Sequence, residues 1–288
     1  MIIACSVDSY FAELAGVLMK SVAINGGVPG AELIILGDRL TRRDRVDLAG
    51  AASPLSIHIM DLDEECRHRV AGLPTSLNWP RAIYGRMLLP DLLNGRSGRL
   101  LYLDSDMVVQ HSLAELETLE LEKLPLAAVP GPHRHLDRDP SIGYFESGTL
   151  LIDLEEWRRR DIGTAAIDWL SRNRSARMPD QDALNMAVGR DYVKLPKKWN
   201  LSPRTKDGAS LAEIAEAHIV HFVGTKPHRR SCTTRGREIY LAVRAQTPWK
   251  DTPLMSDTSE EIRKRKHQIG RALSRLGRLG RRARQEQR

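Results

Sequence analysis

The opening residues alternate between strand-like and helix-like segments, and this order constrains the fold more than any other feature. Short apolar runs at residues 1–6, 31–36 and 54–60 predict strands. Residues 9–24 between them have helical spacing, and residues 41–52 begin with Thr41 as a good N-cap and Asp44 at the capping-box position. Alternating strands and helices form a parallel sheet covered by helices. We therefore expect an α/β fold whose ligands bind beyond the carboxyl ends of the strands.

The stretch RLLYLDSDMVVQ, Arg99 to Gln110, places two carboxylates at the end of a further strand. Residues 100–103 are apolar, as in a strand buried on both faces. In an extended backbone, residues two apart point the same way, so Asp104 and Asp106 can aim at one point. Unpaired buried charges are costly, and a hard divalent cation is the simplest partner for this pair. The alternative is two aspartates that cap a turn or the next helix.

Length and cysteine content place few limits on the chain. Its 288 residues suit one or two domains, and no stretch of about 18 apolar residues predicts a transmembrane helix. The first residues lack a basic segment and include Asp8, so we expect a strand there and not a signal peptide. Cys5, Cys66 and Cys232 are widely spaced, which predicts free thiols in a reducing compartment.

Positive charge is concentrated at the C-terminus. Residues 258–288 hold eleven Lys and Arg against three Glu, a net charge of +8, so residues 1–257 sum to −1 within the total of +7. The body therefore predicts no nucleic-acid groove. From Ile262 to Leu279 the tail carries a narrow apolar stripe amid arginines, typical of a helix on an anionic membrane surface. A disordered tail and a helix docked on a partner are the alternatives. We expect a domain at 1–257 and a basic amphipathic tail at 258–288.

Three later segments carry further candidates. Residues 81–93 predict a helix, with a possible break at Pro90, that holds Arg86; a solvated arginine is the alternative reading. Residues 178–188 predict a helix with Asp180 and Gln181 in its first turn, where capping alone could explain them. Residues 217–223 predict a strand, whose end carries His221 as the better ligand candidate of its two histidines. Gly224 and Lys226 follow it and suit a phosphate or a plain surface turn.

The rest of the chain is expected to connect these segments. Residues 126–129 and 148–153 predict strands, residues 154–159 and 162–172 predict helices, and residues 192–195 and 199–201 predict short extended pieces. Residues 73–79 and 130–143 predict loops, the second long enough to be functional.

Taken in order, these motifs resemble one family. A DSY triplet at residues 8–10 is followed by RMLLP, YLDSDMVV, FESGTLLIDLEEWR, DQDALN and HFVGTKP. Over residues 2–228 the set is similar to family 8 retaining glycosyltransferases, which include glycogenin and bacterial lipopolysaccharide galactosyl- and glucosyltransferases. The resemblance implies a GT-A fold with a mixed, mostly parallel sheet. It also implies a Mn²⁺ or Mg²⁺ ion and a UDP-sugar donor.

The resemblance also implies roles for individual residues. Asp104, Asp106 and His221 match the metal ligands of its D-x-D motif and its histidine. The positions that match the nucleotide and phosphate contacts are Asp8, Tyr10, Arg86, Ser105, Gly224 and Lys226. Asp180 and Gln181 match residues at the donor sugar. Since an amide is a poor nucleophile, front-face attack is the better expectation than a double displacement.

Three departures from the family pattern stand out. Glu146 occupies the position where the family usually has Asn, which puts a carboxylate near the donor sugar, able to alter sugar choice or to act as a nucleophile. The GTKPH segment is one residue shorter than usual and ends in His228, where Trp is usual. Ser9 replaces the usual Asn.

We expect a metal-dependent retaining hexosyltransferase that uses UDP-galactose or UDP-glucose. Its acceptor would be a saccharide on lipopolysaccharide or another cell-surface glycan. The enzyme would be cytoplasmic and peripheral on the inner face of the plasma membrane. A non-catalytic sugar-nucleotide or glycan-binding homologue is the alternative, with the altered Glu146 and His228 in its favour. A nucleic-acid-binding scaffold is a third hypothesis, which the neutral body argues against.

Overall fold

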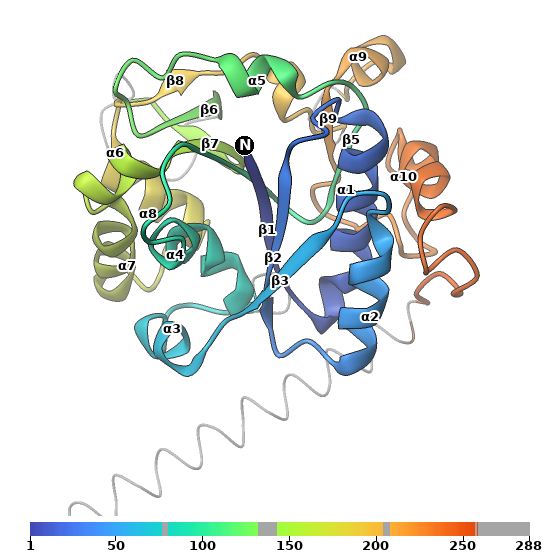
Figure 1. The fold of residues 1–288 in the computed structure, drawn as a ribbon, viewed down its shortest axis with the longest axis horizontal. Coiled ribbons are helices and arrows are strands. Elements are labelled where there is room, and N and C mark those ends of the chain that lie inside the picture. The colour runs from blue at the N-terminus through green and yellow to red at the C-terminus, as the bar shows by residue number, and fades with distance from the viewer. Residues whose placement is uncertain (77–79, 132–142, 204–207, 257, 259–288) are drawn as a thin grey trace, which may run out of the picture.

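A mixed α/β sheet forms the centre of the molecule (Figure 1). The structure is a computed structural model and describes residues 1–76, 80–131, 143–203, 208–256 and 258. Within these residues the main sheet has the strand order β3-β2-β1-β4-β7-β6-β8. Its strands are β1 (Ile2–Asp8), β2 (Glu32–Asp38), β3 (Ile57–Asp61), β4 (Arg99–Leu103), β6 (Leu126–Pro130), β7 (Phe145–Asp153) and β8 (Val193–Lys194).

Parallel pairing dominates the sheet. Strand β1 pairs in parallel with β2 and β4, and β2 pairs in parallel with β3. Strand β7 runs antiparallel to β4 and β6, while β8 is parallel to β6. The expected mixed, mostly parallel sheet is therefore confirmed. A small second sheet pairs β5 (Met107–Val109) with β9 (Ile219–His221) in antiparallel fashion.

Helices cover both faces of the sheet because successive side chains of a strand point to opposite faces. On one face Ile3, Cys5 and Val7 of β1 pack under α1 (Ala12–Asn25), α2 (Arg42–Ala51), the small sheet and α10 (Arg237–Arg244). On the other face Ile2 and Ala4 pack under α4 (Gly85–Leu92), α6 (Leu154–Arg159), α7 (Ile162–Arg172) and α8 (Pro179–Val188). Figure 1 shows these two groups of helices on opposite sides of β1.

Local signals explain several helix boundaries. The predicted capping box forms at α2, where Thr41 and Asp44 bond reciprocally. Residues 81–84 form a 3-10 turn before α4, and α4 continues through Pro90 to Leu92, so the possible break at that proline does not occur.

Several elements differ from the expectations. The helices α3 (Glu64–Arg69), α9 (Leu211–Glu216) and α10 were not predicted, and the chain also contains the short helix α5 (Ala114–Thr118). Strand β7 begins at Phe145, three residues before its predicted start. The extended piece predicted at 199–201 is instead a 3-10 turn, Lys197–Trp199, followed by a single bridge from Leu201 to Val220. Short segments lack the periodicity that separates a turn from a strand.

Residues after the GTKPH segment complete one face of the domain. In α10, Tyr240 Oη donates to Glu13 Oε1 of α1 at 2.8 Å and Arg244 Nε donates to the same oxygen at 2.7 Å. The ring of Trp249 covers Gly16 so closely that a Cβ there would clash with it.

The predicted tail helix, and most of the expected loop at 130–143, lie outside the described residues. In the part of the chain that the structure describes, no helix combines the length and apolar character needed to cross a bilayer. All three cysteines are free and buried.

Candidate active site

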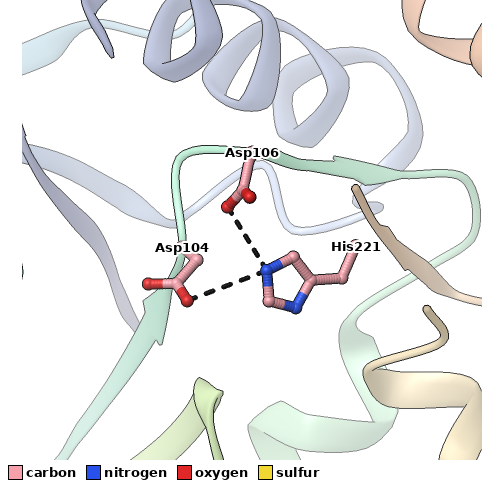
Figure 2. Close-up of side chains that lie close together, drawn as sticks. All are labelled: Asp104, Asp106 and His221. Atoms are coloured by element: carbon pink, nitrogen blue, oxygen red, sulfur yellow. Dashed lines mark ion pairs between the residues drawn. The ribbon is translucent and has the colours of Figure 1, made fainter. Parts of the chain in front are cut away.

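Asp104, Asp106 and His221 come together beyond the carboxyl end of β4 (Figure 2). One potential ligand atom from each lies within 4.8 Å of the other two. His221 Nε2 is 3.3 Å from Asp106 Oδ1 and 3.8 Å from Asp104 Oδ2. These are the three residues whose convergence the sequence reasoning required, although more than a hundred positions separate His221 from the pair.

Strand pairing produces this convergence. Strand β4 ends at Leu103, and Ser105 and Asp106 form a turn, so the backbone here is not extended as the sequence argument assumed. The chain then enters β5, whose Met107 pairs with His221 in β9. The amide of Phe222 also donates to Asp106 O at 2.9 Å, which fixes the turn against the end of β9.

Gly148 leaves room for the three side chains. A Cβ atom at this position would lie 2.8 Å from His221 Cε1, 2.8 Å from Met107 Cε and 3.1 Å from Asp104 Oδ2. Gly148 O also accepts the amide of Asp104 at 2.8 Å, so β7 lies directly beside the cluster. The glycine of the FESG motif is therefore required by space at the candidate metal site.

Two cations balance the carboxylates. Arg86 Nη2 lies 2.6 Å from Asp104 Oδ1, and Lys226 Nζ contacts Asp106 Oδ2. Burial raises the pKa of Asp104 above its usual range, although Arg86 opposes the shift. Burial acts in the same direction on Asp106, but Lys226 and His221 outweigh it and hold the pKa of Asp106 well below its usual range. Burial would lower the pKa of His221, but Asp106 reverses the effect and the pKa is raised.

This donor set fits a divalent metal ion. Carboxylate oxygens suit hard cations such as Mg²⁺ and Mn²⁺, and an imidazole nitrogen is a common ligand for transition metals. The three groups are gathered at one point, and Gly148 keeps that point clear of a side chain.

Arg86 is buried, with 4% of its surface exposed, so the interpretation as a solvated arginine is wrong. Its Nη1 donates to Ser147 O at 2.7 Å and Ser147 Oγ at 2.8 Å, and lies 3.0 Å from Asp180 Oδ2. Burial alone would lower the pKa of Arg86, but Asp104 and Asp180 raise it above its ordinary value. The guanidinium thus joins α4 to β4, β7 and α8.

The first turn of α8 faces β7. Ser147 Oγ donates to Asp180 Oδ2 at 3.0 Å, and Ser147 N donates to Gln181 Oε1 at 3.1 Å. Gln181 Nε2 donates to Tyr144 Oη at 3.0 Å. Helix capping does not explain Asp180, because its carboxylate pairs with Arg86 and Ser147. The structure therefore brings Asp180 and Gln181 into the same network as Arg86 and Asp104.

Glu146 lies in β7 and is half-buried, and burial raises the pKa of its carboxyl. Its Oε2 accepts a hydrogen bond from Asn200 Nδ2 at 3.3 Å. Asn200 Oδ1 in turn lies 2.9 Å from His221 Nδ1. Sequence reasoning missed Asn200, since a single Asn after a tryptophan carries no signal. It also gave Ser147 and Tyr144 no role, although both lie in or beside the FESG motif.

The candidate nucleotide residues lie at the carboxyl end of β1 and in the segment after β9. Asp8 ends β1, and its Oδ1 accepts the amides of Tyr10 at 3.0 Å and Phe11 at 3.3 Å. The Tyr10 ring packs against His228, and Arg229 Nη2 donates to Tyr10 Oη at 3.0 Å. This connects Tyr10 to the segment that carries Lys226.

Two smaller candidates have simple backbone roles. Ser105 occupies the turn between the two aspartates. Gly224 has φ +90°, a conformation that L side chains rarely adopt, so a glycine is required at this point of the phosphate segment.

The fold and the site define an α/β protein that gathers carboxylates, an imidazole and cations at the carboxyl edge of a mostly parallel sheet. Ligand sites of such proteins lie at this edge. The family model described as Glycosyl transferase family 8 matches residues 2–232. This chain belongs to glycosyl transferase family 8, as its motifs predicted.

Named relatives match most of the chain. It is 26% identical over 280 residues to lipopolysaccharide 1,3-galactosyltransferase of Salmonella typhimurium, with 91% of this chain and 83% of that protein covered. It is likewise 26% identical over 282 residues to lipopolysaccharide 1,2-glucosyltransferase of Escherichia coli, with the same shares covered. General stress protein A of Bacillus subtilis is 25% identical over 272 residues, covering 86% of this chain and 94% of that protein.

Solved structures share the fold. The galactosyltransferase LgtC, in complex with donor and acceptor sugar analogues, superposes with a TM-score of 0.73 at 22% identity, covering 87% of this chain and 99% of that one. The glycosyltransferase GlyE of Streptococcus pneumoniae gives a TM-score of 0.66 at 19% identity, covering 87% of this chain and 61% of that one. The expected GT-A fold is therefore confirmed.

Proposed function

We propose that this protein is a divalent-metal-dependent, retaining hexosyltransferase. It moves galactose or glucose from a UDP-sugar to a saccharide acceptor of lipopolysaccharide or another cell-surface glycan. The observation that carries the proposal is the grouping of Asp104, Asp106 and His221 within 4.8 Å in a family 8 chain. The names of two relatives, a lipopolysaccharide galactosyltransferase and a lipopolysaccharide glucosyltransferase, support the substrate class.

Asp104, Asp106 and His221 are the proposed ligands of a Mn²⁺ or Mg²⁺ ion. When bound, such an ion supplies positive charge opposite the diphosphate of the departing UDP. Lys226 supplies a further positive charge at the same place, since its ammonium already contacts Asp106. Arg86 holds the Asp104 carboxylate and Ser147 in fixed positions, so the site needs little rearrangement when the donor arrives.

Asp180 and Gln181 are the proposed contacts of the donor sugar. The Gln181 amide is held on both sides, by Ser147 N and Tyr144 Oη, so its position is fixed. An amide oxygen is a weak nucleophile compared with a carboxylate, which favours attack by the acceptor hydroxyl on the face that the leaving UDP vacates. Glu146 remains the alternative nucleophile, and a Glu146→Gln variant with unchanged rate and donor preference would eliminate that role.

Asp8, Tyr10 and Ser105 complete the proposed donor site at its nucleotide end, with Gly224 in the phosphate segment. The edge-to-face contact of Tyr10 with His228 and its hydrogen bond with Arg229 support a continuous surface from the nucleotide to Lys226.

The basic tail, residues 258–288, is the proposed membrane attachment. Its net charge of +8 would hold the enzyme at an anionic surface, and we propose a cytoplasmic location on the inner face of the plasma membrane. Deletion of the tail should abolish sedimentation with anionic vesicles. It should not change sedimentation with neutral vesicles, which we expect to be at background level with or without the tail. Equal binding to anionic vesicles before and after deletion would contradict this part of the proposal.

A screen of UDP-sugars tests the proposed function. We expect Mn²⁺-dependent release of UDP with UDP-galactose or UDP-glucose, lost on addition of EDTA and in the Asp106→Asn variant. Asp153→Asn is the matched control. Asp153 is the N-cap of α6 and lies at the end of β7 that is remote from Glu146 and Ser147, and Asn is an equally good N-cap. Metal-independent turnover would contradict the metal site. Tight UDP binding without turnover of any UDP-sugar would favour the non-catalytic homologue.

A further inference from the structure

Asn200 is buried at the centre of a hydrogen-bonded chain that no role given so far requires. Only 3% of its surface is exposed. Its amide nitrogen donates to Glu146 Oε2 at 3.3 Å, and its amide oxygen lies 2.9 Å from His221 Nδ1. The other ring nitrogen of His221 points toward Asp104 and Asp106. One side chain thus connects a carboxylate of β7 with the candidate metal ligand of β9.

With Glu146 ionised, the chemistry of the three groups allows one arrangement of the hydrogens between them. An ionised carboxylate only accepts hydrogen bonds, so Glu146 selects the NH₂ side of the Asn200 amide. The amide oxygen must then face His221, and it can only accept. His221 Nδ1 therefore carries a hydrogen, so the ring nitrogen available to a metal is Nε2, which points toward the two aspartates. This is the tautomer that a neutral imidazole needs to bind a metal through Nε2.

Backbone hydrogen bonds hold Asn200 and His221 in fixed relation. His218 N donates to Lys198 O at 2.9 Å, Leu201 N donates to Ile219 O at 3.0 Å, and His221 N donates to Leu201 O at 2.9 Å. Trp199, which precedes Asn200, is fully buried and anchors the segment. Glu146 accepts from the nitrogen of this amide and so orients it from the side opposite His221.

We propose that Asn200 is a positioning residue, anchored by Glu146, that fixes the His221 tautomer in the metal-binding form. The inference rests on the proposed function only in taking His221 as a metal ligand. It gives Glu146 a second task, in which its carboxylate orients the Asn200 amide as well as facing the donor site.

The test measures Mn²⁺ binding by electron paramagnetic resonance without donor, and uses ¹⁵N NMR of the metal-free protein to determine whether His221 Nδ1 carries a hydrogen. Asn200→Leu should weaken Mn²⁺ binding about 10–100-fold, the usual cost of removing a partner of a metal-ligating histidine. Asn25→Leu is the matched control, because it removes an amide that donates to Val109 O at 2.8 Å, away from His221. The control should bind Mn²⁺ as the unaltered protein does.

A double substitution keeps the test decisive if Asn200→Leu does not fold. Glu146→Gln together with Asn200→Asp exchanges the carboxylate and the amide. A carboxylate oxygen at position 200 would then accept from His221 Nδ1, and an amide nitrogen at position 146 would donate to the same carboxylate. We expect this variant to bind Mn²⁺ at least as tightly as the unaltered protein, and its His221 to keep the hydrogen on Nδ1.

Two results would overturn the inference: a folded Asn200→Leu protein with unchanged Mn²⁺ affinity, or NMR spectra of the unaltered protein that show no hydrogen on His221 Nδ1. Failure of the unaltered protein to bind Mn²⁺ would instead count against the proposed function.

Discussion

Replacement of Arg86 by Met should destabilise the fold strongly, because the guanidinium is buried between two carboxylates. It lies 2.6 Å from Asp104 and 3.0 Å from Asp180, with 4% of its surface exposed. Removing one partner of a buried ion pair costs about 3–5 kcal/mol, since the remaining charge is left uncompensated. Two carboxylates lose their partner here, so we expect a loss of unfolding free energy of about 4–5 kcal/mol. Urea denaturation followed by circular dichroism measures it.

Arg96→Met provides the matched control. Arg96 binds Glu32 through two nitrogens, at 2.8 and 2.5 Å, but both side chains are about two-fifths exposed. Exposed pairs contribute about 0–1 kcal/mol, so the control should lose no more than that.

The pH dependence of the loss separates charge from packing. Burial already raises the pKa of Asp104, and loss of Arg86 raises it further above the unfolded value. A carboxyl whose pKa is higher in the folded than in the unfolded state destabilises the fold at high pH, and this destabilisation disappears as the carboxyl takes up a proton. The deficit of Arg86→Met should therefore shrink between about pH 8 and about pH 5, and that of Arg96→Met should not. A loss below about 1 kcal/mol, or one equal to the control, would refute the reasoning.

Three further predictions concern the site and the buried thiols. Gly148→Ala would bring a Cβ to 2.8 Å from His221 Cε1, so it should lower the free energy of unfolding by about 1–3 kcal/mol and weaken Mn²⁺ binding. Gly30→Ala is the control and should change neither quantity in thermal unfolding or Mn²⁺ titration, because no atom lies within 4 Å of its Cβ position. Because the pKa of His221 is raised, protons compete with Mn²⁺ for this ligand, so calorimetry in two buffers should detect proton release, and the Mn²⁺ affinity should decrease as the pH is lowered. Burial raises the pKa of Cys66 to about 11, and Cys5 is fully buried with its pKa raised, so both thiols should react with Ellman's reagent only after unfolding.

Sequence patterning predicted the parts of the fold that repeat along the chain. The alternation of Ile2, Ile3, Ala4 and Cys5 between two cores follows from the period of a strand, which the apolar run revealed. The capping box at Thr41 was likewise readable because its partners are three residues apart. Helix α10 was not predicted, since its packing on α1 depends on residues more than two hundred positions away.

In the candidate site, too, the sequence predicted the local features and missed those that depend on distant residues. The chemistry of Asp104, Asp106 and His221 was visible as residue types at strand ends, and motif order brought them into one hypothesis. The burial of Arg86 was not visible, because an arginine beside an apolar helix face is usually solvated and only the fold supplies its two carboxylate partners. Asn200 was missed because its importance depends on the register between residues 198–201 and β9.

Counting Mn²⁺ ions bound in the presence of UDP tests the central claim most directly. Equilibrium dialysis should find one ion per chain for the unaltered protein and for Asp153→Asn, and none for Asp106→Asn at the same free Mn²⁺. Binding that persists in a folded Asp106→Asn protein, or that is absent from the unaltered protein with UDP, would contradict the claim that these aspartates and His221 hold the metal at the diphosphate.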